Sequence, residues 1–574
     1  MQTLINKLSL LFLSCPLVAL AQEQNGNYSM LPLKDLTAFE SSVPNWSVQG
    51  GVTINPNNAS KPRFTAGEGI LIGTPGNLIT TKLKAADLRL SMEFMVSPGA
   101  EGYIILPGNQ KLLISDSGRK PAMDAHTSGY LGQFPTQNAA KVPGLWQTLE
   151  LAYDASVPLL PQSGRLNKLS LNGVTVLETV YLPLDKHVDS APISFEVKKG
   201  TIAFRNIGYQ LLASRKPATL TDMSYKLYAD KWDSKTFEKL DHEGKADALT
   251  QEVSKGLREF HLFYEGNIDI REGGEYQFTS IYQGNVFTLD IDGKSVIQKG
   301  ESSSQESHTG AITLSPGKHP FKIHYSRFPW MRPALGLRVE KAGIRSYDLH
   351  ALSSLPEPEP KPYISVKPEM KPEMVRSFIL LDGETSKRTH CISVGNPQGW
   401  NYTVDLNRGA LLQAWKGQFA NVTEMWYQRG EPQLLYPAGL TVPVSGKSSF
   451  AILADNSTTW PDSSDINFKG YQLDQGGTPT FKYAIGGAEI TDKLTSEYDG
   501  ITRTLQINGT SQGNVYALLA QGKDIVLIEK GLYQIDNRYF IRLDKKAQVI
   551  LRPKGDGKEM LLPVGRSSAY TMFW

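Results

Sequence analysis

The chain has 574 residues, and 60 Lys and Arg balance 57 Asp and Glu to a formal net charge of +3. This balance provides no strong attraction for nucleic acid or for an anionic membrane, so we expect neither as a partner. The length predicts about three or four domains. The 51 Gly, 34 Pro and 9% aromatic residues favour short strands joined by many turns.

The N-terminus predicts a secretory signal peptide over residues 1–21. Lys7 supplies a positive start, Leu8 to Leu20 form an apolar run, and Ala19-Leu20-Ala21 is an A-x-A cleavage site. We therefore expect export to the periplasm, the cell surface or the medium. A lipoprotein signal ending at Cys15 is the alternative. No run is long enough for a transmembrane helix, so we expect no transmembrane segment.

Residues 30–212 have the pattern of a β-sandwich. Apolar residues alternate from Leu88 to Val96, which is typical of a half-buried strand. Leu169-Ser170-Leu171 and Val174-Thr175-Val176 flank Asn172-Gly173, a pair that favours a tight hairpin turn. No long amphipathic helix interrupts these strands, so the pattern predicts an antiparallel sandwich.

Several motifs of this block stand in an order that resembles a known family. They are Trp46-Ser47-Val48, Gly102 to Gly108, Ser128-Gly129-Tyr130, Asn138 to Trp146, Leu171-Asn172-Gly173 and Phe204-Arg205-Asn206-Ile207. Together they resemble the 3-keto-disaccharide hydrolases, whose fold is a lectin-like (concanavalin-like) jelly roll in secreted bacterial proteins. The resemblance implies a hydrolase acting on glycosides or 3-keto-glycosides, with its site on the concave face of the module.

One strand departs from the family pattern. The family tends to read Tyr-Glu-Val-Gln-Ile-Leu-Asp where this chain reads Gln110 to Asp116. Lys111 stands at the acidic position and Leu113 at the amide position, and only Asp116 matches. Since a Lys cannot replace a carboxylate, the departure favours a second hypothesis, a non-catalytic glycan-binding or cell-surface scaffold protein.

The remaining polar residues of this region are the candidate site. Asp116 and His126 could act as catalytic base or acid, since functional clusters favour loops. We expect four further residues to contact substrate: Tyr103, Lys111, Tyr130 and Gln133. Tyr103, Tyr130 and Trp146 could stack on sugar rings. The alternative is that Asp116 caps a turn, that His126 is a solvated loop residue, and that Trp146 packs in the core. The sequence assigns no metal ligands and identifies no cofactor.

Residues 213–348 form a second β-rich block. Its strand and turn order resembles the protective-antigen-type domain, a β-sandwich often attached to glycosidases, adhesins and toxins. In sugar-binding members an acidic pair helps to hold calcium, but the matching place here reads Tyr282-Gln283-Gly284-Asn285. The resemblance therefore does not extend to calcium-dependent sugar binding.

A linker follows over residues 349–374, because Pro356 to Pro362 alternates proline with Glu and Lys and favours an extended spacer. Residues 375–574 read as a C-terminal β-rich domain. There, Arg388 and Asp405 suggest an ion pair, and the neighbours His390 and Cys391 should point to opposite faces of a strand. The sequence thus predicts an all-β protein of three β-sandwich or jelly-roll modules joined by a Pro-rich linker. Its expected ligand is carbohydrate.

Overall fold

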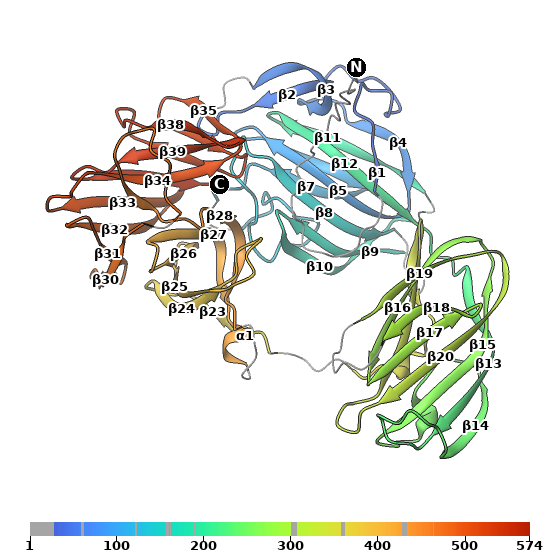
Figure 1. The fold of residues 1–574 in the computed structure, drawn as a ribbon. Helices are drawn as coiled ribbons and strands as arrows, with labels where there is room; N and C mark the ends of the chain where they lie inside the picture. The colour runs from blue at the N-terminus through green and yellow to red at the C-terminus, as the bar shows by residue number, and fades with distance from the viewer. Residues whose placement is uncertain are drawn as a thin grey trace, which may run out of the picture.

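The computed structural model describes residues 28–574 except 59–61, 121–122, 156–159, 161, 187, 189, 300–306, 358–361, 428–432 and 463. Strands in several sheets make up nearly all of its regular structure (Figure 1). The predicted all-β fold class is confirmed. The expected signal peptide, residues 1–21, lies outside the described residues. No helix among the described residues is long and apolar enough to cross a membrane.

The first module, defined by the strands from β1 to β12, consists of two facing antiparallel sheets. The larger sheet has the order β10-β9-β8-β5-β12-β3-β2, with β1 also paired to β12, and the smaller has the order β4-β11-β6-β7. The strands of the larger sheet are β1 (Ser29–Met30), β2 (Trp46–Thr53), β3 (Arg63–Gly73), β5 (Asp87–Val96), β8 (Gln147–Asp154), β9 (Ser163–Leu171), β10 (Val174–Pro183) and β12 (Ile202–Leu212). Those of the smaller sheet are β4 (Ile79–Ala85), β6 (Glu101–Leu106), β7 (Gln110–Ser115) and β11 (Ala191–Lys199).

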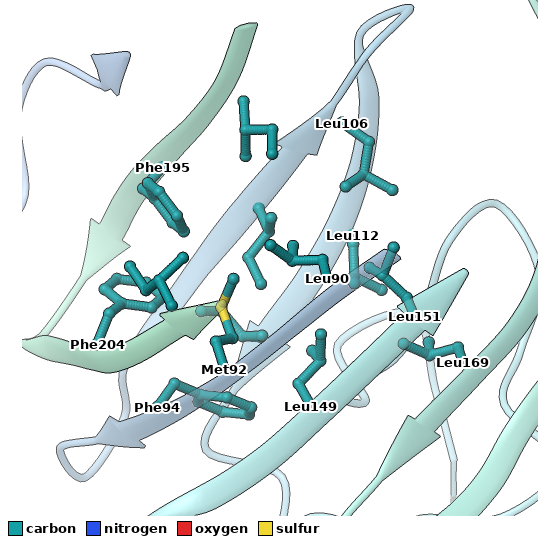
Figure 2. Packing of buried hydrophobic residues seen from close by; sticks show 14 of the residues in the cluster. Leu90, Met92, Phe94, Leu106, Leu112, Leu149, Leu151, Leu169, Phe195 and Phe204 are labelled. Atoms are coloured by element: carbon teal, nitrogen blue, oxygen red, sulfur yellow. The ribbon is translucent and has the colours of Figure 1, made fainter. Parts of the chain in front are cut away.

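Alternating apolar side chains fill the space between these two sheets. Leu90, Met92 and Phe94 of β5 meet Leu112 of β7 and Phe195 of β11, all buried (Figure 2). The strand predicted over residues 88–96 is therefore confirmed, and its period of two sets which side chains enter the core.

The predicted hairpin is also confirmed as β9 and β10. Asn172 and Gly173 form its turn with φ of 53° and 80°, the left-handed values that a type I′ turn requires. This turn joins the two strands at one edge of the larger sheet.

The second module, residues 213–348, is another pair of antiparallel sheets, with the orders β14-β13-β15-β20-β17-β18 and β19-β16-β21-β22. Its strands are β13 (Ala218–Tyr228), β14 (Leu240–Ala246), β15 (Phe260–Ile270), β16 (Gly274–Gln283), β17 (Val286–Ile291), β18 (Lys294–Lys299), β19 (Thr309–Leu314), β20 (Gly317–Arg327), β21 (Ala334–Lys341) and β22 (Ile344–Asp348). A 3₁₀ turn, η1 (Glu252–Ser254), lies within this module, and a second, η2 (Leu352–Ser354), follows its last strand.

Backbone pairing and a branched ion pair join the first two modules. Ala213, which directly follows the last strand of the first module, β12, forms a parallel bridge with Ile344 of β22, with hydrogen bonds of 3.0 Å on both sides. Beside it, the Arg345 guanidinium lies 2.7 Å from carboxylate oxygens of both Asp87 and Asp154. Because these two carboxylates are largely buried in the first module, Arg345 fixes the second module against it.

The C-terminal part is built from three sheets, drawn from yellow to red in Figure 1. One contains β23 (Ser365–Val366), β24 (Glu373–Ile379), β25 (Arg388–Gly395), β26 (Trp400–Asp405), β27 (Ala410–Asn421) and β28 (Tyr436–Pro443). The second contains β29 (Phe450–Leu453), β34 (Asn514–Gly522), β38 (Ile550–Lys554) and β39 (Gly557–Pro563). The third contains β30 (Asn467–Leu473), β31 (Pro479–Ile485), β32 (Ala488–Glu497), β33 (Gly500–Asn508), β35 (Ile525–Glu529), β36 (Leu532–Ile535), β37 (Tyr539–Leu543) and β40 (Ser568–Phe573). A short helix α1 (Thr423–Trp426) follows β27.

The C-terminal module packs directly on the first module. Val142 and Leu145 belong to a core cluster formed mainly by residues of the C-terminal sheets. The Trp146 amide donates to Asn537 Oδ1 over 3.2 Å, and the indole is 7% exposed with the Arg205 guanidinium 4.1 Å from its ring centroid. The Trp146 side chain therefore packs on Ile70, Ile72 and Met95 of the first module, whereas its backbone amide contacts the C-terminal module.

One ion pair and one pair of neighbouring side chains in the C-terminal module agree with the sequence-based expectations. Arg388 pairs with Asp405 at 3.0 Å, and this contact joins neighbouring strands. Cys391 is buried whereas His390 is exposed, so the two side chains point apart as predicted. Part of the expected linker is paired, since Ser365 and Val366 form β23 against β27, and residues 358–361 lie outside the described residues.

Candidate functional site

The outer face of the four-stranded sheet brings the polar candidates together. Tyr103 on β6 lies opposite Glu196 on β11 and opposite Leu113 on β7. Alternation places Glu101 on the same face as Tyr103, two residues earlier on the strand. A Cβ at Gly102 would collide with the Glu196 carbonyl, so glycine is needed for the close approach of β6 to β11.

A shallow pocket of about 250 Å³ opens at the end of this face, where β6, β7 and β11 meet the loop after β7. Its lining residues are Gly99, Ala100, Glu101, Ser115, Asp116, Lys120, His126 and Lys199. The two residues expected to be catalytic, Asp116 and His126, therefore line one pocket. Its volume has room for one sugar ring rather than for a longer chain.

His126 is oriented by a carboxylate. Its Nδ1 lies 2.9 Å from Glu101 Oε2, and the Glu101 side chain is 16% exposed whereas the imidazole is 61% exposed. Because the Glu101 carboxylate holds Nδ1, Nε2 is the ring nitrogen that points away from this contact. The pair has the form of an oriented general base, because the carboxylate stabilises the imidazolium formed on proton uptake.

Asp116 has a structural partner in the same pocket. Its carboxylate accepts a 2.9 Å hydrogen bond from the Gly99 amide, and its own amide donates to the Ala100 carbonyl over 2.9 Å. Gly99 has a φ of 73°, so the carboxylate closes a turn that needs a left-handed residue. His126 is thus paired with Glu101, and Asp116 is paired with the turn before β6.

Two lysines add positive charge to the pocket. The Lys120 ammonium is 2.9 Å from Asp124, and this contact lowers the pKa of the exposed Asp124 carboxyl. Lys199 lies opposite Glu101 at the end of β11, and its side chain is exposed. An ammonium in this position is suited to an anionic oxygen of a bound molecule.

Lys111 belongs to a neighbouring ion-pair cluster on the same face. Its Nζ is 3.6 Å from Glu196 Oε2 and 5.6 Å from the centroid of the Tyr103 ring, and Lys198 pairs with the other oxygen of Glu196. Burial raises the pKa of Tyr103, and the charges of Glu101 and Glu196 raise it further. The Lys111 ammonium is therefore held beside the pocket, not among the residues that line it.

Tyr130 and Gln133 lie in the loop that follows β7. The Tyr130 carbonyl accepts a 3.0 Å bond from the Leu113 amide, and its ring packs edge-on against Phe134 at 5.4 Å. The Gln133 side chain is exposed. Neither residue lines the pocket, and Tyr130 with the exposed Phe134 forms a separate aromatic surface.

Sequence reasoning missed Glu101 and Lys199. Glu101 could have been found, because its spacing from Tyr103 along one strand places both side chains on one face. Lys199 could not, because only the pairing of β11 with β6 brings it opposite Glu101. The same pairing supplies Glu196, a carboxylate next to the position where Lys111 replaces the expected acid.

Comparison with known proteins agrees with the fold of the first module. Residues 33–209 match the model of a family described as the 3-keto-alpha-glucoside-1,2-lyase-like domain, which indicates a carbohydrate-related function. No curated protein matches the chain.

Solved structures with similarity to parts of the chain include two of carbohydrate-related proteins. A candidate glycosyl hydrolase from Parabacteroides distasonis is 17% identical, with a TM-score of 0.25, over 32% of this chain and 100% of that protein. A PA14 sugar-binding domain from an RTX adhesin is 14% identical, with a TM-score of 0.19, over 22% of this chain and 93% of that domain. The protective-antigen-type resemblance of residues 213–348 stays a prediction.

Proposed function

We propose that the first module cleaves 3-keto-glycosides, with His126 as the general base and Glu101 as its orienting carboxylate. The observation that carries this proposal is the 2.9 Å contact between His126 Nδ1 and Glu101 inside the pocket. The family match of residues 33–209 supports the substrate class.

A carbonyl at C3 makes the proton on C2 acidic, so cleavage needs one base and one cation rather than two carboxylates. His126 Nε2 takes the C2 proton, and the electron pair of that C–H bond forms the C2–C3 double bond of an enolate while the carbonyl π electrons move onto the C3 oxygen. The C3 carbonyl then re-forms, the C2–C3 electron pair makes the C1–C2 double bond, and the C1–O bond breaks. The aglycone oxygen leaves with the electron pair of that bond and takes the proton from the His126 imidazolium, which restores the neutral base. Lys199 lines the pocket as the cation that stabilises negative charge on the C3 oxygen.

The geometry supports this elimination better than direct glycoside hydrolysis. Hydrolysis of an ordinary glycoside uses two carboxylates with separate roles. Here Glu101 is bonded to His126, and Glu196 is paired with Lys111 and Lys198. Both glutamates of this face therefore already have basic partners, and Asp116, the other carboxylate that lines the pocket, is bonded to the Gly99 amide.

The second candidate is glycan binding without turnover. The replacement of the expected acid and amide by Lys111 and Leu113 favours it, since Leu113 is 1% exposed and cannot contact a ligand. Export, which the N-terminal 21 residues predict, is part of both proposals and is tested by locating the protein in cell fractions.

The decisive assay follows aglycone release from an aryl 3-keto-α-glucoside. We expect turnover by the full chain and a loss of about 10²- to 10⁴-fold in His126→Ala, the usual contribution of a general base. Glu101→Gln should also reduce kcat, whereas Asp116→Asn should cost less than tenfold. His242→Ala is the matched control, since His242 also contacts a carboxylate, Asp241 at 2.6 Å, but lies in the second module.

Two outcomes decide against the proposal. Turnover that survives in His126→Ala removes the assigned base. No turnover by the full chain, combined with saturable binding of the same 3-keto-glycoside, establishes the binding function instead.

A further inference from the structure

A second cavity lies at the junction of the first and second modules, apart from the pocket of the four-stranded sheet. Its volume is about 680 Å³, within the range of roughly 300–1,000 Å³ that ligand sites occupy. Its lining includes the side chains of Arg89, Tyr209, Gln210, Glu275, Gln277 and Glu340. We propose that this cleft is a binding site for a neutral oligosaccharide, independent of the proposed reaction.

The cleft is formed before any ligand arrives. The bridge between Ala213 and Ile344 holds the two modules along one side. The contacts from Arg345 to Asp87 and Asp154, both 2.7 Å, hold them at a second point. A cavity between parts that are joined in this way costs little ordering on binding.

Cross-strand pairs supply the polar groups of both walls. On the first module Gln210 lies opposite Arg89 in the pairing of β12 with β5. On the second module Gln277 lies opposite Glu340 in the pairing of β16 with β21. Residues directly opposite in a sheet present their side chains together, so each wall offers one amide beside one charged group.

This chemistry selects a neutral polyhydroxylated ligand. Arg89 and Lys341 balance Glu275 and Glu340, so the lining has no net charge to attract an ion. The Lys341 ammonium is also engaged, at 3.0 Å from the Gly273 carbonyl and 4.7 Å from the centroid of the Tyr276 ring.

Amides both donate and accept hydrogen bonds, as sugar hydroxyls do. The exposed Leu211, beside the half-buried Tyr209, adds apolar surface for the C–H faces of a sugar ring. The volume corresponds to a short oligosaccharide rather than a single ring, since the smaller pocket of the first module already has room for one ring.

The test uses the full chain on an array of neutral gluco-oligosaccharides of two to four units, in α and β linkages, beside the corresponding uronic acid oligomers. We expect retention of neutral oligomers. The double variant Gln210→Ala/Gln277→Ala should weaken that binding about tenfold or more, because each lost hydrogen bond costs roughly a factor of two to ten. Ala342→Trp, which fills the cleft from an exposed loop, should abolish it.

His126→Ala distinguishes this site from the proposed reaction, because it should leave retention unchanged. The inference is overturned if no neutral oligomer is retained, or if the uronic acid oligomers are retained better. It is also overturned if retention is insensitive to the double variant and to Ala342→Trp. Unchanged circular dichroism spectra of the variants exclude loss of fold as the cause.

Discussion

Removal of the arginine that joins the first two modules should destabilise the protein by about 2–3 kcal/mol. Breaking a buried pair by deleting one partner costs roughly 3–5 kcal/mol, because the other charge stays buried without compensation. In Arg345→Met the cost is reduced, since the Arg345 side chain is 27% exposed and Asp154 keeps Arg165 at 2.9 Å. Among the described residues, Asp87 keeps the hydroxyl of Ser214 and the amide of Ala155, both at 3.1 Å.

The effect should also depend on pH in a defined direction. Burial raises the pKa of Asp87, and Arg345 opposes that shift, so the variant should have a still higher pKa in the folded state. A carboxyl whose pKa is raised on folding destabilises the folded protein when ionised, and this penalty disappears as the pH falls through the raised pKa. The difference between wild type and Arg345→Met should therefore shrink in acid.

The assay is urea unfolding followed by tryptophan fluorescence, to which Trp232 and Trp330 of the second module contribute among the nine Trp of the chain. Arg338→Met is the matched control, because Arg338 also pairs with an aspartate, Asp348 at 2.9 Å, but the two side chains are 41% and 33% exposed. Its loss should cost less than about 1 kcal/mol. If Arg345→Met costs no more than the control, the junction is not held by this ion pair.

Three further predictions concern separate parts of the fold. Burial and the neighbouring His261 lower the pKa of His324 to about 4, below the ordinary 6.5. Stability should therefore fall by up to about 3 kcal/mol as the pH drops from 6.5 to 4, and His324→Phe should reduce this dependence in urea titrations at several pH values. Burial lowers the pKa of Lys416 to about 8, so the charged ammonium destabilises the folded chain at pH 7. Lys416→Met should therefore stabilise the chain by about 1–2 kcal/mol at pH 7 and by less at pH 10. An equal gain at both pH values would contradict this prediction. Gly173→Val should lower the free energy of unfolding by about 1–2 kcal/mol. A side chain at this φ of 80° is strained, although no atom lies within 4 Å of the added Cβ. An unchanged free energy of unfolding would refute the turn assignment.

Local patterns in the sequence were sufficient for the class of fold. The alternation from Leu88 to Val96 and the Asn172-Gly173 turn depend only on the strand period and on backbone sterics, which act between near neighbours. For that reason β5 and the β9–β10 hairpin were predictable without knowledge of the other strands. The opposite orientations of His390 and Cys391 follow from the same period.

The arrangement of the site depended on tertiary structure. His126 and Glu101 are 25 residues apart, and Lys111 and Glu196 are farther apart still, so no local pattern indicates either pair. Each forms only because β6 lies between β7 and β11. Trp146 shows the same limit, since its side chain is buried against Ile70 and Ile72 of β3 and Met95 of β5, which are distant in the sequence. Thus the sequence alone determined the strands and their turns, whereas sheet order and module packing decided which distant side chains meet, because those contacts arise from long-range pairing.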